Sequence, residues 1–212
     1  MAEGLFDQMT RGLKSLDIQL GLGEPLIDYV NLLHKWNKPY NLTAVRRPED
    51  MVIKHVLDSL TLAPFITSFQ RLCDVGTGAG LPGIPLALCF PDKKFVLLDS
   101  NGKKTRFLYQ VCQKLNLHNV SIVEGRAETY QPEKGFDAVM SRAFADLNRM
   151  CNLTAHLLDS EGVWLAMKSQ TVDTEIADLS VSVEVSEQID LVVPGLEELR
   201  QLVVMRRREN KK

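Results

Sequence analysis

The chain has 212 residues, a net charge of −2 and 45% hydrophobic residues, a composition typical of soluble globular proteins and not of disordered or fibrous chains. No stretch approaches the roughly 18 consecutive apolar residues of a membrane span, and no signal segment opens the chain, so we expect a cytoplasmic protein. The four cysteines are widely spaced and form no C-x-x-C pair. The sequence therefore predicts neither a zinc site nor a disulfide framework, and no metal.

The first third of the chain has the pattern of a helical extension. One helix is predicted to begin at Pro25 and to end near Trp36, where turn-forming residues gather. A second is predicted over residues 48–64, with a proline at each end. We expect this extension, residues 1–65, to pack on a core formed by residues 66–212.

A glycine-rich stretch follows the extension. Residues 72–75 are apolar and predict a buried strand, residues 84–90 predict a helix, and residues 95–98 predict a second strand that ends at Asp99. Glycine allows sharp turns and a close approach of the backbone to a ligand. An acid at the end of the second strand can accept the hydroxyls of a ribose. The glycines between strand and helix stand at alternate positions: Gly76, Gly78 and Gly80.

The spacing of these glycines separates the possible cofactors. A dinucleotide-binding loop requires G-x-G-x-x-G, but Leu81 occupies the position of its last glycine. No Lys-Ser or Lys-Thr closes the loop, so it is not a Walker sequence. Asp74 lies two residues before the first glycine, and the combined pattern resembles motifs I and II of the class I S-adenosylmethionine methyltransferases. The alternative is a glycine-rich turn in an unrelated α/β protein.

The remainder of the chain alternates between strand and helix patterns. This alternation, with the strands of the glycine-rich stretch, predicts an α/β, Rossmann-like fold with a mostly parallel sheet of seven strands covered on both faces. Ligands bind such sheets beyond the carboxyl ends of the strands, where Asp74, Asp99, Glu128, Arg142 and Lys168 lie. The further predicted strands are 120–123, 136–141, 163–167, 181–185 and 202–205, and the helices are 103–115, 145–158 and 171–179.

Two of these strand-end positions suggest particular contacts. We expect Glu128, with Ala127 beside it, to face the adenine edge of the cofactor. We expect Arg142 to lie where cofactor and substrate meet and to orient one of them. The alternative for Arg142 is a salt bridge to Asp74 or to Glu128.

Five segments of the chain are distinctive: 34–43 (HKWNKPYNLT), 55–59 (HVLDS), 74–85 (DVGTGAGLPGIP), 98–100 (LDS) and 141–145 (SRAFA). Together they resemble one family, the bacterial 16S ribosomal RNA small-subunit methyltransferase G family, also called glucose-inhibited division protein B. The resemblance spans roughly residues 26–168 and implies methyl transfer from S-adenosylmethionine to N7 of one guanosine, position 527 in the 530 loop of 16S rRNA, with S-adenosylhomocysteine as product. Since N7 carries no proton, an in-line transfer governed by positioning needs no general base.

The resemblance also implies site residues. Its cofactor contacts fall on Gly76, Leu81, Ala127, Glu128 and Arg142, to which the residue patterns add Asp74, Gly78, Gly80 and Asp99. Basic and polar residues are candidates for contact with RNA. Affinity that comes from contacts with RNA phosphates weakens as the salt concentration rises. The basic tail, residues 206–212, is as typical of a solvated chain end as of a segment that contacts phosphate. The RNA candidates are Asn41, Arg46, Arg47, His55, Lys103, Lys104, Arg106, Lys168, Arg206, Arg207 and Arg208.

The expected partner is 16S rRNA, the 30S subunit or an assembly intermediate, with no membrane involved and the chain acting as a monomer. Three alternatives remain open on the sequence. The core pattern is compatible with a methyltransferase that acts on a small molecule or a protein. It is also compatible with a cofactor-sensing module without turnover. A nucleotide-dependent dehydrogenase is disfavoured by the glycine spacing.

Overall fold

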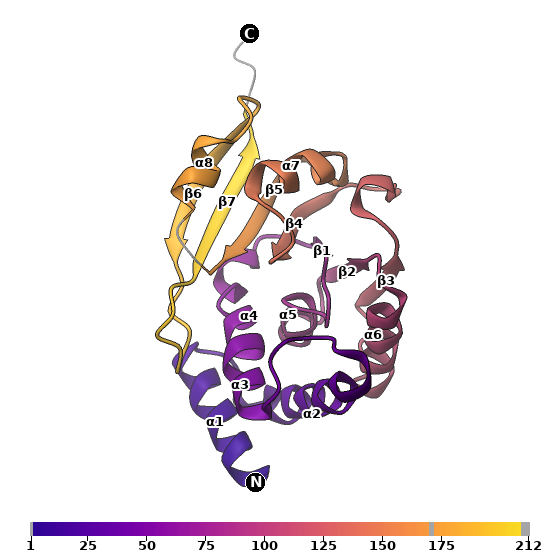
Figure 1. Cartoon of the computed structure of the whole chain (residues 1–212), viewed down its shortest axis with the longest axis vertical. Helices are drawn as coiled ribbons and strands as arrows, with labels where there is room; N and C mark the ends of the chain where they lie inside the picture. Colours follow the sequence, from indigo (N-terminus) through magenta and orange to yellow (C-terminus); the bar gives the residue numbers. More distant parts are fainter. Residues whose placement is uncertain (1, 170–171, 209–212) are drawn as a thin grey trace.

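A computed structural model describes residues 2–169 and 172–208, and a sheet of seven strands forms its centre (Figure 1). The strand order is β3-β2-β1-β4-β5-β7-β6. Strands β1 to β5 are parallel, whereas β7 is antiparallel to both β5 and β6, which confirms the predicted mostly parallel α/β sheet. The strands are β1 Arg71–Val75, β2 Lys94–Asp99, β3 Val120–Glu124, β4 Phe136–Arg142, β5 Leu158–Lys168, β6 Val183–Asp190 and β7 Gln201–Arg207.

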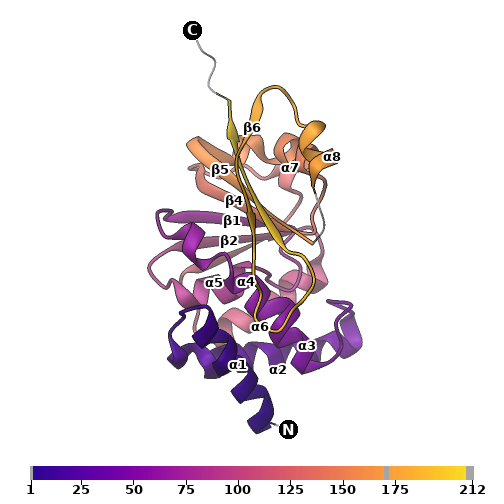
Figure 2. The same cartoon turned by 90° about the vertical axis from the view of Figure 1, so that its left-hand side faces the viewer.

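Helices cover both faces of this sheet. Successive strand side chains point to opposite faces, so Ala138 and Met140 of β4 join one hydrophobic cluster and Val139 joins the other. In Figure 2 the β6–β7 hairpin stands nearly upright while β1 and β2 run across the view, which reflects the twist of the sheet. The first face carries α1 Ala2–Ser15, α2 Gly23–Tyr40, α5 Gly83–Cys89 and α6 Gly102–Lys114, and the second carries α7 Leu147–Thr154 and α8 Asp173–Ala177.

The N-terminal helices share the core of the first face. Met9 of α1, Tyr29 of α2, Ile84 of α5 and Phe107 of α6 are fully buried in one cluster. The helical extension therefore packs on the sheet domain through a continuous apolar interior. Whether residues 1–65 form a separate unit stays a prediction.

The first predicted helix ends later than its sequence suggests. Helix α2 continues past Trp36 through Pro39 to Tyr40, so the predicted end is wrong by about one turn. Proline in the last turn removes only one backbone donor, and the stacked rings of Trp36 and Tyr40, 5.1 Å apart, support that turn. Asn41 then ends the helix in the left-handed conformation, with φ 50° and ψ 51°.

The second predicted helix is interrupted by a wider turn. It comprises α3 Pro48–Met51, a π-helical segment Val52–Leu57 and α4 Asp58–Leu60. A short 3₁₀ turn, Ala63–Ile66, precedes β1. Single π-helical turns occur often at functional sites, and this one carries the side chains of a charged cavity described below.

Four elements toward the C-terminus also have bounds other than those predicted. The helix predicted over 145–158 ends at Thr154, and β5 begins at Leu158. Strand β6 continues to Asp190, beyond the predicted 181–185, because an edge strand alternates polar residues that an apolar pattern does not detect. Helix α8 is shorter than predicted, and residues 170–171 lie outside the described residues.

Among the described helices, none has both the length and the apolar character needed to cross a membrane.

Candidate active site

The loop after β1 has the backbone that its glycines allow. Gly76, Gly78 and Gly80 have φ of +65°, +61° and +90°, a region that side chains disfavour. The amide of Gly76 donates to the Leu98 carbonyl of β2, 2.9 Å away, so the loop turns across the end of the neighbouring strand. A Cβ on Gly80 would collide with Ile84. The alternate glycines thus form the sharp turn that their spacing predicts.

The side chain of Asp74 connects the first part of this loop to its last part. Its Oδ2 accepts hydrogen bonds from Thr77 Oγ1 at 2.7 Å and from the Gly83 amide at 2.8 Å. Its Oδ1 is buried and has no hydrogen-bond partner among the described residues. Burial raises the pKa of this carboxyl group to about 7. Asp74 therefore fixes the loop, and its predicted contact with a cofactor stays a prediction.

Tyr29, which the sequence patterns do not mark as a site residue, also supports the loop. The hydroxyl of Tyr29, from α2, donates to the Ala79 carbonyl at 2.8 Å. The side chain is fully buried, so the helical extension holds the glycine loop through a bond shielded from water. The only sequence signal is a tyrosine at an apolar position of the helix.

A cavity of about 350 Å³ lies above the loop, at the carboxyl ends of the parallel strands. Of the predicted cofactor residues, Gly76, Asp99, Ala127 and Glu128 line it. Gly78, Gly80 and Leu81 belong to the loop beside it, and Arg142 lies in a neighbouring cavity. The structure thus brings strand-end residues of β1, β2 and β3 to one cavity.

Protein groups already occupy several of the hydrogen-bond acceptor positions of the Asp99 carboxylate. Its Oδ2 accepts from the Gly78 amide at 2.9 Å and from Lys104 Nζ at 3.4 Å, and its Oδ1 accepts from the Asn101 amide at 2.9 Å. A carboxylate offers about four acceptor positions, so two ribose hydroxyls would compete with the long bond to Lys104. Lys104, a candidate for RNA contact, thus lies in this cavity.

These features suit S-adenosylmethionine. At Gly76 the glycine loop presents backbone without a side chain to the cavity, which allows a ligand to approach closely. The carboxylates of Asp99 and Glu128 both line the cavity, as does the buried Ala127, and their contacts with ribose and adenine stay predictions.

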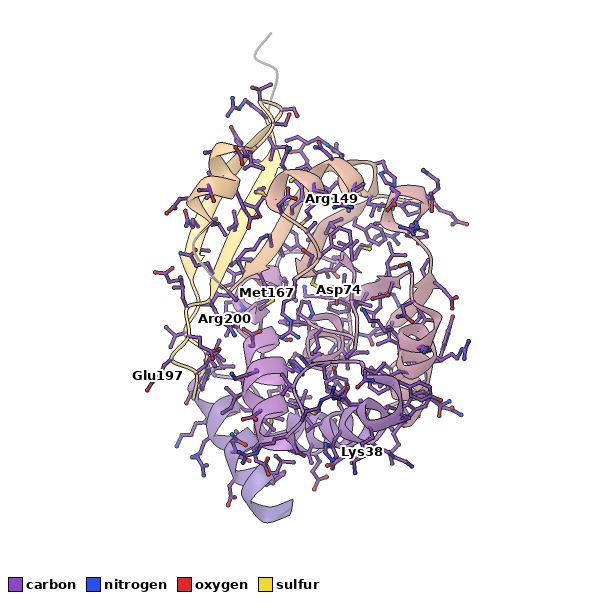
Figure 3. The ribbon with its side chains drawn as sticks, in the orientation of Figure 1. Lys38, Asp74, Arg149, Met167, Glu197 and Arg200 are labelled. Atoms are coloured by element: carbon purple, nitrogen blue, oxygen red, sulfur yellow. The ribbon has the colours of Figure 1, made fainter. Side chains whose placement is uncertain are left out.

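A second cavity, of about 640 Å³, adjoins the first. Ala143 lines both. Its φ of +56° is unusual for a residue with a Cβ, and the chain bends there. Arg142, before this bend, lines the larger cavity, and Phe144, after it, lines the smaller. Met167 and Arg200, both labelled in Figure 3, line the larger cavity.

Arg142 is held rigidly in the larger cavity. Its Nη1 donates to Asp58 Oδ2 and to the Lys54 carbonyl, both at 2.8 Å. The other oxygen of Asp58 lies 3.2 Å from Arg200 Nε. The alternative salt bridge to Asp74 or Glu128 is therefore wrong, because the partner is Asp58 from the helical extension. The orienting role of Arg142 stays a prediction.

His55, a candidate for RNA contact, is buried beside Arg142. Its Nε2 lies 2.8 Å from Thr43 Oγ1, and its Nδ1 lies 2.9 Å from the Lys54 carbonyl. The Thr43 hydroxyl also accepts from the Val45 amide at 3.2 Å, and Nδ1 also lies 3.2 Å from Arg142 Nη2, which can only donate. The neutral ring therefore has two consistent arrangements: Nδ1–H donates to Lys54 while Nε2 accepts from Thr43, or Nδ1 accepts from Arg142 while Nε2–H donates to Thr43. Burial and the nearby Arg142 lower the pKa of His55 to about 4, so the ring is neutral at neutral pH.

Several other RNA candidates lie near the two cavities. Lys168 lines the larger cavity and pairs with Glu175 at 2.7 Å. Lys103 and Arg106 are exposed on the first turns of α6, and neither forms an ion pair within the described part of the chain. Among the remaining candidates of the helical extension, Arg46 donates to Asn41 at 2.9 Å, and Arg47 lies 3.5 Å from Glu49.

The start of the basic tail lies away from the cavities. Because β7 is antiparallel to β5, Gln201 pairs with Lys168 at the cavity end while Arg206 pairs with Val163 at the opposite edge. Arg206 and Arg208 both face Glu184, and the Arg207 guanidinium donates to three backbone carbonyls. The structure does not bring these residues to the site, and residues 209–212 lie outside the described residues.

Comparisons with solved structures identify the fold. A SAM-dependent methyltransferase from Aquifex aeolicus superposes with a TM-score of 0.60 at 13% identity, over 79% of this chain and 97% of that one. A SAM-dependent methyltransferase from Thiobacillus denitrificans, solved in complex with S-adenosyl-L-homocysteine, gives a TM-score of 0.50 at 13% identity, over 72% of this chain and 90% of that one. The fold is that of the class I S-adenosylmethionine methyltransferases, and S-adenosylmethionine is the cofactor of this class.

Comparisons of sequence identify the family. The sequence model of a family described as rRNA small subunit methyltransferase G matches residues 23–204. The chain is also 54% identical over 178 residues to a protein of Hydrogenovibrio crunogenus named ribosomal RNA small subunit methyltransferase G, covering 84% of this chain and 82% of that protein. The family model and the relative each cover more than four fifths of the chain. The chain belongs to the rRNA small subunit methyltransferase G family.

Proposed function

We propose that this chain methylates 16S rRNA at N7 of a single guanosine, position 527 in the 530 loop, with S-adenosylmethionine as methyl donor. The observation that carries the proposal is the pair of cavities that share Ala143. The smaller presents the carboxylate of Asp99 and the glycine loop, and the larger presents charged groups beside it. A donor in one cavity and a base in the other would meet at their common wall.

The smaller cavity would hold the cofactor through the Asp99 carboxylate, the loop at Gly76 and the wall formed by Ala127 and Glu128. When bound, S-adenosylmethionine supplies a methyl group activated by its sulfonium. The protein's residues then need to exclude water and to fix the acceptor, because correct placement alone can lower such a barrier considerably.

The larger cavity suits an acceptor that loses no proton. Guanine N7 carries a lone pair and no hydrogen, so no residue has to accept a proton from it. His55 is neutral but hydrogen-bonded at both ring nitrogens, which leaves it to position other groups. Arg142 is a positioning residue for the target nucleotide, since Asp58 and the Lys54 carbonyl fix its guanidinium.

The charges of the larger cavity favour an anionic substrate. Its cations outnumber its carboxylates by one, and each carboxylate already pairs with a cation. Phosphate contacts outside the cavity would add affinity without sequence information, with Lys103 and Arg106 as candidates. The cations that line the cavity are Lys54, Arg142, Lys168 and Arg200, and the acids are Asp58, Glu175 and Glu198.

The proposal also covers the form of the substrate, the compartment, the oligomeric state and the role of the helical extension. The substrate is the 30S subunit, an assembly intermediate or free 16S rRNA, in the cytoplasm, and the chain acts as a monomer. Residues 1–65 act as a helical extension that supplies Lys54, His55 and Asp58 to the larger cavity.

Transfer of a radiolabelled methyl group from S-adenosylmethionine tests the proposal. Small ribosomal subunits lacking the modification, subunits that already carry it and free 16S rRNA are incubated with the protein. We expect label in the 16S rRNA of the unmodified subunits and none in the modified subunits. Label in ribosomal protein, or no label in any RNA despite cofactor binding, would reject RNA as the substrate.

A further inference from the structure

The segment between β6 and β7, residues 191–200, covers one side of the larger cavity. In Figure 1 this yellow segment reaches down to the N-terminal helices. Gly195, with φ +82°, packs so closely on Ile53 that an added Cβ would lie 3.2 Å from Ile53 Cδ1. This contact places the following residues beside the π-helical segment of the extension.

Glu198 on this segment connects two cations of the cavity. Its Oε1 lies 3.0 Å from Lys54 Nζ, and its Oε2 lies 3.2 Å from Arg200 Nη2. Each carboxylate oxygen thus faces a different cation, one from the helical extension and one from the residue just before β7. Both cations lower the pKa of Glu198, with the hydrogen bond from Lys54 as the largest cause, so the carboxylate is ionised.

The carboxylate and its two cations differ in how firmly they are held. The Glu198 side chain is 54% exposed and that of Lys54 is 39% exposed, whereas Arg200 is only 13% exposed. Arg200 is fixed from behind by Asp58, whose Oδ1 lies 3.2 Å from its Nε. An exposed ion pair is weak, so Glu198 can leave while the Arg200 guanidinium stays in place.

We propose that Lys54 and Arg200 form a binding site for an RNA phosphate, and that Glu198 occupies this site until the substrate displaces it. A carboxylate and a phosphodiester both present two anionic oxygens to a pair of donors. Glu198 keeps the two cations together in the free enzyme and competes with the RNA. The inference rests on the proposed function, because it takes RNA as the substrate, and it adds a phosphate site at the edge of the larger cavity.

The neighbouring acid provides a matched control. Glu197 is exposed and forms no ion pair within the part of the chain that the structure describes. In Figure 3 it points outward from the molecule, away from Arg200. Glu197→Gln and Glu198→Gln remove the same charge from adjacent residues, but only the second removes the competing carboxylate.

The experiment measures binding of unmodified small subunits, with S-adenosylhomocysteine present, to wild type and both variants. We expect Glu198→Gln to lower the Kd by about two- to fivefold, the range for loss of one competing exposed ion pair, and Glu197→Gln to lower it less. Lys54→Gln should weaken binding and reduce the salt slope by about one contact. In the Lys54→Gln background, the gain from Glu198→Gln should shrink, since the two residues act on one site.

The outcomes distinguish this inference from the proposed function. If the wild-type enzyme methylates the subunits but Glu198→Gln and Glu197→Gln change the Kd equally, or Glu198→Gln weakens binding, the phosphate site is overturned and the function stands. If the wild-type enzyme neither binds nor methylates any RNA, the proposed function itself fails.

Discussion

The ring of Phe144 lies directly against Gly76, so that a Cβ added to Gly76 would approach Phe144 Cδ2 to 2.6 Å. Both residues line the smaller cavity, which is proposed to hold the cofactor and is called the cofactor cavity below. The contact joins the glycine loop after β1 to the segment after β4. The left-handed Ala143 directs Phe144 toward this loop, while Arg142 lies in the other cavity. The geometry of the cofactor cavity therefore depends on the absence of a side chain at Gly76.

Replacing Gly76 by alanine tests this dependence. The new methyl group would meet Phe144 and force alanine into a positive φ, which costs roughly 1–2 kcal/mol for an L-residue. We expect the Kd for S-adenosylhomocysteine to rise at least about tenfold, measured by isothermal titration calorimetry, because one tenfold step corresponds to about 1.4 kcal/mol. Gly21→Ala, where nothing lies within 4 Å, is the control. Unchanged affinity of Gly76→Ala would remove Gly76 from the cofactor site.

Replacing Tyr29 by phenylalanine tests the bond between the helical extension and the glycine loop. It leaves the buried Ala79 carbonyl without its donor, which costs roughly 1–3 kcal/mol. We expect a lower denaturant midpoint and weaker binding of S-adenosylhomocysteine. Tyr40→Phe is the control, since Tyr40 is 42% exposed and its hydroxyl forms no hydrogen bond within the described chain. If both variants behave alike, the Tyr29 bond does not support the loop.

The buried Asp74 predicts a pH dependence of stability. Burial raises its pKa from 3.8 to about 7 in the folded protein, so the folded state holds the proton that the unfolded state loses. Its contribution to stability is present below about pH 4, falls as the pH rises toward 7, and changes no further above that. We expect the stability of wild type relative to Asp74→Asn to decrease over this window in urea unfolding. A constant difference from pH 4 to pH 8 would show that Asp74 does not titrate there.

Arg142 should affect transfer more than cofactor binding. It lies in the larger cavity, bonded to Asp58 and the Lys54 carbonyl, and not in the cavity of Asp99. We expect Arg142→Ala to reduce kcat by about 100-fold, since small misplacements cost on that order, with little change in the Kd for S-adenosylhomocysteine. Arg142→Lys keeps the positive charge but loses the planar set of guanidinium donors, so its kcat should lie between those of wild type and Arg142→Ala. Full activity of Arg142→Ala would disprove a positioning role.

The sequence predicts the sheet, the glycine loop and the strand-end acids because each depends on local patterns. Apolar runs indicate buried strands, and alternate glycines indicate the positive φ found at Gly76, Gly78 and Gly80. The bond from Arg142 to Asp58 joins residues 84 positions apart, and no local pattern specifies it. The same holds for Tyr29 with Ala79, 50 positions apart.

The basic residues illustrate a second reason for failure. Charge in the sequence does not say which end of a strand a residue occupies or whether its charge is already paired. Arg207 belongs to a basic run, yet its guanidinium binds backbone carbonyls at the edge opposite the cavities. Lys104 looks like a surface lysine but lies against Asp99 in the cofactor cavity. The antiparallel pairing of β7 determines the position of Arg207, and the way α6 packs on the sheet determines that of Lys104.

The most direct test of the central claim is the identity of the methylated nucleoside. Unmodified small subunits are methylated by the purified enzyme, the 16S rRNA is digested, and the nucleosides and fragments are analysed by liquid chromatography and mass spectrometry. We predict 7-methylguanosine at a single guanosine, position 527 in the 530 loop. A methyl group on another atom, another base or another region of the RNA would contradict the proposed function.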